Sequence, residues 1–166
     1  MQTKEYMDIV RIITRIILTS PQKMIREMDL QNLCSEFNFD EIISDVYNNL
    51  KTLGFDFIKS NFLDQNYYIL TMEGKDDLIT PIQYGTLALI IALSKELDEN
   101  LKILDLQEIF KDVWNSDIRF LLENDYLREM EDHGIIKVTP LGKAILKNLL
   151  PDLKLGNLLD ILKDKE

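Results

Sequence analysis

Apolar residues recur with the period of an α-helix at the start of the chain. In residues 4–18 they fall into two stripes. The first stripe consists of Val10, Ile13 and Ile17. The second stripe consists of Ile9, Ile12 and Ile16. A helix with two apolar stripes has two surfaces to bury, its own core and one other contact.

The residues that follow predict two more helices and a hairpin. A short helix is expected over residues 30–37 with Asp29 as its cap, and a longer one begins near Asp40. Gly54 stands where that helix needs a C-terminal cap. Aromatic and β-branched runs at 55–59 and 67–70 then indicate two strands. Three helices followed by a hairpin is the order of a winged-helix domain.

The second half of the chain repeats this order. Thr80 and Gln83 can form a capping box, and Pro81 occupies the first helical position. These signals predict a helix that runs to about Leu97. The remaining expected elements are short helices over 105–111 and 115–124, strands at 127–130 and 135–138, and a helix from Pro140 to Pro151. The leucines of residues 153–163 form a further amphipathic pattern.

The predicted fold class is therefore mainly α with small β-hairpins, an α+β protein. It contains two tandem winged-helix domains, residues 1–76 and residues 80–166. The second domain carries a C-terminal helical tail. The architecture repeats between the two halves, while the residues themselves do not.

The composition favours a soluble intracellular protein. The chain has 166 residues, of which 46% are hydrophobic and 29% are charged. One Cys excludes an internal disulfide framework. Residues 1–5 lack the basic and apolar runs of a secretory signal, and the longest apolar run, 87–93, is too short to span a membrane. We expect a cytoplasmic protein without membrane contact.

Catalytic chemistry finds little support in the sequence. A Cys–His pair could come only from Cys34 and His133, the sole residues of their kinds. Cys34 lies on an apolar helix face and His133 at a predicted turn tip. So few Cys and His exclude a zinc spacing, and six scattered Gly make no phosphate loop. We expect no enzymatic activity, cofactor or metal.

The distribution of charge opposes binding to nucleic acid. The net charge is −10, with 29 acids against 19 Lys and Arg. The predicted third helix of each domain, which enters the major groove in many winged-helix proteins, carries three carboxylates against one basic residue. Each of these helices therefore has a net charge of −2, which repels phosphate. We expect no direct contact with nucleic acid.

A surplus of apolar residues favours a protein partner. The helix over residues 81–97 has apolar residues on two sides, and a winged-helix core covers one of them. The second side must meet the neighbouring domain, a second copy or a partner. The candidate partner-binding residues are Tyr84, Leu87 and Ile91, with Leu155 and Leu158 of the tail. The candidate self-association residues are Ile9, Ile12 and Ile16.

Several stretches resemble the segregation and condensation protein B family, tandem winged-helix (kite) proteins that attach to the kleisin of SMC complexes. The stretches are Ile12–Pro21 (IITRIILTSP), Leu53–Ile58, Asn66–Thr71 and Thr80–Leu93 (TPIQYGTLALIIAL). The segment Ile135–Gly142 departs from the bacterial pattern, which has a glycine-arginine-proline segment there, and is similar to archaeal winged-helix proteins. This departure favours a divergent relative.

The resemblance implies a homodimer formed through the first domains, with the second domains gripping a segment of the kleisin. It implies a non-enzymatic accessory subunit that acts in chromosome organisation and segregation and associates with the nucleoid through its partner. Two alternatives share the fold. One is a winged-helix DNA-binding transcription regulator, and the other is a scaffold subunit of another multiprotein complex.

Overall fold

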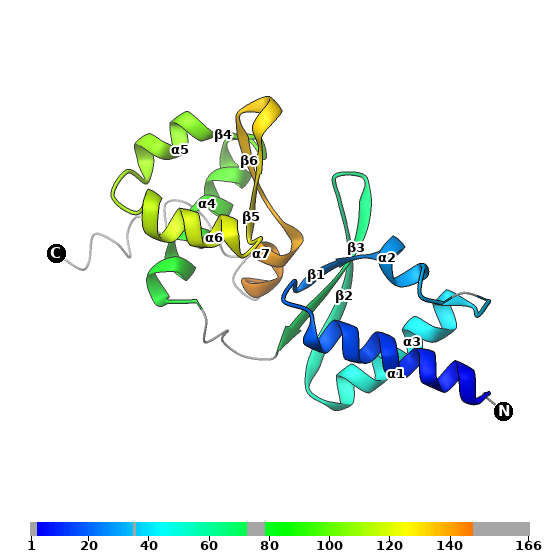
Figure 1. Cartoon of the computed structure of the whole chain (residues 1–166). Coiled ribbons are helices and arrows are strands. Elements are labelled where there is room, and N and C mark those ends of the chain that lie inside the picture. The colour runs from blue at the N-terminus through cyan, green and yellow to red at the C-terminus, as the bar shows by residue number, and fades with distance from the viewer. Residues whose placement is uncertain (1–2, 35, 73–78, 148–166) are drawn as a thin grey trace. The chain divides into compact units, whose positions relative to one another are not determined.

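The protein folds into two compact units, Met1–Lys75 and Asp76–Glu166. The computed structural model describes residues 3–34, 36–72 and 79–147. Each unit combines helices with a three-stranded antiparallel sheet (Figure 1). The α+β class and the winged-helix order predicted from the sequence are confirmed. The predicted C-terminal helix lies outside the described residues.

The first unit holds three helices and three strands. In chain order they are α1 (Lys4–Thr19), β1 (Met24–Arg26), α2 (Glu27–Gln31), α3 (Phe39–Thr52), β2 (Phe55–Phe62) and β3 (Gln65–Met72). The strands lie in the order β1-β3-β2. The core consists of one face of α1, the inner faces of α2 and α3, and the aromatic rings of Phe57 and Tyr68. These two rings stack with centroids 4.9 Å apart.

The second unit repeats the plan with shorter strands. In chain order they are α4 (Pro81–Glu96), β4 (Leu101–Lys102), α5 (Ile103–Ile109), the π-helix η1 (Trp114–Ile118), α6 (Arg119–Glu123), β5 (Leu127–Met130), the 3₁₀-helix η2 (Glu131–His133), β6 (Ile135–Val138) and α7 (Pro140–Ile145). The strand order is β4-β6-β5. None of the helices in the described part of the chain is long and apolar enough to cross a membrane.

Local signals placed some helix starts correctly and others wrongly. The capping box of Thr80 and Gln83 is present, with Pro81 in the first turn of α4. Asp29 does not cap α2, which begins two residues earlier because β1 leads directly into it. The third helix of the second unit, expected over 115–124, begins as a π-helix at Trp114. Wider helical turns of this kind are frequent at functional positions.

Candidate protein-interaction surfaces

One flank of α1 carries the predicted self-association residues. Ile13 and its stripe are buried in the core, whereas Ile12 is 43% exposed and Ile9 and Ile16 are half-buried. Ile9 packs against the edge of the core. The flank therefore presents Ile12 to its surroundings with Ile9 and Ile16 beside it. The opposite flank of α1 exposes Met7 to a similar extent, 39%.

The predicted partner-binding residues of α4 require a correction. Leu87 and Ile91 are 0% and 1% exposed, so both side chains are core residues without surface for a partner. The sequence placed them on a surplus face because α4 is apolar all round, a pattern typical of a buried helix. Tyr84 is half-buried and retains some surface. Leu155 and Leu158 lie outside the described residues.

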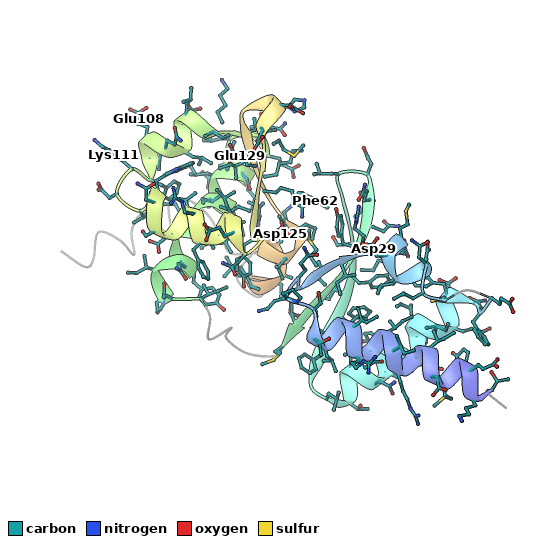
Figure 2. The ribbon with its side chains drawn as sticks, viewed as in Figure 1. Asp29, Phe62, Glu108, Lys111, Asp125 and Glu129 are labelled. Carbon is teal, nitrogen blue, oxygen red and sulfur yellow. The ribbon has the colours of Figure 1, made fainter. Side chains whose placement is uncertain are left out.

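The third helices of both units expose carboxylates. On α3, Asp40 and Glu41 are exposed in the first turn. In the second unit, Glu123 is exposed at the end of α6 and Asp117 is half-buried in η1. In the neighbouring α5, Glu108 is exposed and points outward in Figure 2. Negative charge at these positions repels a phosphate backbone and attracts a cationic partner.

The two residues with potential reactivity are Cys34 and His133, and each lies in an ordinary structural position. Cys34 is buried, its thiol donates to the Leu30 carbonyl at 3.4 Å, and burial raises the pKa of the thiol. A buried neutral thiol is a poor nucleophile. His133 is exposed at the end of η2. Within residues 3–34, 36–72 and 79–147, no group of three or more His, Cys, Asp or Glu is arranged to hold a metal ion.

A polar network that the sequence did not reveal ties α2 to the first hairpin. Glu27 accepts from the Lys59 ammonium at 2.5 Å and from the Asn66 amide at 2.7 Å. The Lys59 ammonium also lies 5.8 Å from the centre of the Tyr68 ring. The hydrogen bond from Lys59 lowers the pKa of Glu27, and the same bond raises the pKa of Lys59. The network fixes the hairpin against α2.

A second network joins α7 to the turn before β5. Thr139 caps α7 by accepting from the Gly142 amide at 3.1 Å, and its hydroxyl donates to the Asp125 carbonyl at 2.5 Å. Asp125 has a positive φ of 60° and binds Arg128 through both carboxylate oxygens, at 2.7 and 2.8 Å. Gly142 packs directly on the Tyr126 carbonyl, and no side chain fits between them.

Comparison with known proteins gives a likeness of fold. No protein-family model matches the chain, and no curated protein matches its sequence. Among solved structures, the fold is similar to that of a chain in the Nse1-Nse3-Nse4 complex, with a TM-score of 0.57 and 10% sequence identity. The match covers 92% of this chain and 77% of the other, so it extends over both units.

Proposed function

We propose that this protein is a non-enzymatic accessory subunit that binds the kleisin of an SMC complex in chromosome organisation and segregation. The observation that carries the proposal is the acidity of the third helix in both units. A winged-helix fold normally offers this helix to DNA, and here its exposed carboxylates Asp40, Glu41 and Glu123 suit a cationic protein surface instead.

The kleisin is the partner that the sequence resemblance implies. The fold likeness supports the same kind of role, since the similar chain belongs to a complex of three different proteins. In this proposal the protein acts in the cytoplasm and reaches the nucleoid through its partner. Tyr84 of α4 remains a candidate contact, together with Leu155 and Leu158 of the C-terminal tail.

Self-association through the α1 flank is the second part of the proposal. Ile12 is the most exposed member of the flank and would lie at the centre of a two-fold contact between copies. An isologous contact of this kind needs only one apolar patch per copy. Ile9 and Ile16 would enlarge the patch on either side.

Co-expression with the kleisin encoded in the same genome tests the proposal. We expect the two proteins to co-purify through size-exclusion chromatography in about 0.15 M salt, where partly buried charge pairs are screened only weakly. Separation of the two proteins, both folded, would remove the kleisin from the proposal.

A titration with random duplex DNA tests the main alternative. A transcription regulator binds non-specific DNA with micromolar, salt-sensitive affinity at low salt. For the accessory subunit we expect no binding under the same conditions, because the third helices are negatively charged, as the phosphate backbone is.

A further inference from the structure

The two sheets differ in the length of their outer strands. In the first sheet the outer strands are β1 and β2, and in the second they are β4 and β5. Three of these are short, with three residues in β1, two in β4 and four in β5. The β2 strand has eight residues. A long outer strand presents a row of unpaired backbone groups to other chains, and proteins usually protect such edges.

The register of the hairpin shows which backbone groups of β2 point outward. Leu63 and Asp64 form a two-residue turn with φ of 51° and 60°, as in a type I′ turn, and Phe62 pairs with Gln65 beside it. Such a closing pair is hydrogen-bonded, and bonded pairs alternate along an antiparallel ladder. The N–H and C=O groups that face away from β3 therefore belong to Phe55, Phe57, Lys59 and Asn61.

An independent hydrogen bond on β3 agrees with this alternation. Leu70 lies opposite Phe57, and its N–H donates to the Lys23 carbonyl at 3.0 Å, on the side of β1. Leu70 thus bonds away from β2, as a residue of a non-bonded pair must. Phe57 correspondingly directs its backbone to the free edge. In the described part of the chain, no backbone bond joins these outward-facing residues to another segment.

Several of the usual protections of an outer strand are missing from β2. The strand contains neither Pro nor Gly, and its pairing runs from Phe55 to Phe62 without a bulge. The one Lys of the strand does not guard the edge, because Glu27 and the Tyr68 ring hold its ammonium against the hairpin. A strand that is long, regular and unguarded is suited to pairing with another extended segment.

We propose that the free edge of β2 binds an extended segment of the partner protein by strand addition. The segment would bond to the outward groups of Phe57, Lys59 and Asn61. On the outer face of the sheet its side chains would lie beside Ile58 and Phe62, the latter labelled in Figure 2, so apolar residues belong at alternate positions of the segment.

Charge favours a partner segment over a second copy at the β2 edge. The hairpin carries three charges, Asp56, Lys59 and Asp64, and Glu27 neutralises the Lys. Asp64 in the turn and the net charge of −10 of the chain therefore favour a segment that carries Lys or Arg. Two copies that paired through their β2 edges would bring carboxylates of the same hairpin close together, and like charges opposite one another destabilise a pair of strands. The inference rests on the proposed function only in identifying this partner as the kleisin.

Amide hydrogen exchange on the full chain tests the inference with a defined probe. The probe is a synthetic peptide, KVTVTVTVK, and its control carries Pro in place of the central Thr. With the probe we expect exchange at Phe57, Lys59 and Asn61 to slow by about tenfold or more, a change typical of newly formed backbone bonds. Ile58 and Ser60, already paired with β3, should not change. The control peptide should protect none of them.

A pair of variants at one position checks the mode of binding. Asn61→Pro removes an outward donor that the hairpin does not use, whereas Asn61→Thr keeps it, and both lose the same side-chain bond to Asn66. We expect Asn61→Pro to weaken peptide binding at least about fivefold relative to Asn61→Thr, the loss of roughly one hydrogen bond. Unchanged exchange at the odd-numbered amides with the probe in the wild type and in Asn61→Thr, or equal peptide affinity of the two variants, overturns the inference.

Three further outcomes separate the inference from the proposed function. Protection of the odd-numbered amides that grows with protein concentration, without peptide, would identify a second copy as the occupant and overturn the inference. Co-purification of the kleisin with no change at these amides would overturn it as well and leave the proposed function intact. Protection by the peptide without binding of the kleisin would support strand addition at the β2 edge and would contradict the kleisin as the partner.

Discussion

Gly142 provides the most direct test of packing in the second unit. A Cβ at this position would lie 2.3 Å from the Tyr126 carbonyl oxygen and 3.2 Å from Val138 Cγ1. The nearest atom is backbone and cannot turn aside, so α7 must move by about 1 Å to restore ordinary contact. That movement pulls Thr139 away from the Asp125 carbonyl and weakens the cap of α7.

The expected cost of Gly142→Ala follows from these contacts. Overpacking costs about 1–3 kcal/mol, and the hydrogen bonds of Thr139 add about 1 kcal/mol each. The higher helix propensity of Ala returns about 1 kcal/mol. We expect a loss of about 3 kcal/mol, equivalent to about 15 °C in the melting temperature of a unit of this size.

Urea denaturation followed by tryptophan fluorescence measures the effect in the correct unit. Trp114 is the sole Trp of the chain and belongs to the second unit, so its emission reports the unfolding of that unit. Gly85→Ala is the matched control. Gly85 also lies in a helix, but a Cβ there meets no atom within 4 Å, so we expect this variant to stabilise by about 1 kcal/mol. A rise in stability for both variants would refute the packing argument.

Three other substitutions test separate parts of the structure. In the wild type the first hairpin should lose stability at acid pH. In Glu27→Gln this loss of stability, measured by hydrogen exchange, should be smaller. The folded pKa of Glu27 is lowered, so its contribution is present above the unfolded pKa and disappears as the pH falls through the folded value. Burial and the hydrogen bond to Asp45 raise the pKa of the Tyr6 phenol to about 12. Tyr6→Phe should remove this titration from the ultraviolet absorbance. Its folded pKa is raised, so its stabilisation should decline between about pH 10 and 12 in the wild type only. Ile12→Lys should shift the protein from dimer to monomer in sedimentation, whereas Met7→Lys, equally exposed on the other flank, should leave the dimer intact.

Local sequence signals predicted those elements whose causes lie within a few residues. Thr80, Pro81 and Gln83 define the start of α4 through contacts among themselves, so the prediction needed no knowledge of the fold. The first hairpin is similar, because the aromatic and β-branched runs at 55–59 and 67–70 specify the centres of its two strands. The repeated order of these elements was sufficient for the winged-helix plan.

Features that depend on distant parts of the chain were not predicted. The strands β1 and β4 are too short to show a period, and each exists because a later strand pairs with it. Glu27 and Lys59 are 32 residues apart, so their ion pair required the folded hairpin. The error at Leu87 arose because α4 is apolar on every side, and an all-round pattern does not distinguish a core face from a docking face.

Burial changes how the partner surface should be examined. A charge at Leu87 would unfold the second unit, so loss of binding in such a variant would say nothing about contact. Tyr84, which is half-buried, and Ile12, which is exposed, are better positions for charged replacements. Charged replacements that test the interface therefore belong at exposed or half-buried positions of the helices.

A nuclease-treated pull-down from native lysate, read by mass spectrometry, tests binding of this protein to an SMC complex. The bait is the tagged full chain, and the tagged Ile12→Lys variant serves to separate self-association from partner binding. We expect a kleisin or an SMC ATPase to be recovered with the wild-type bait. Recovery of neither, with the bait folded and dimeric and with duplex DNA bound in a salt-sensitive titration, would contradict the account and favour a transcription regulator.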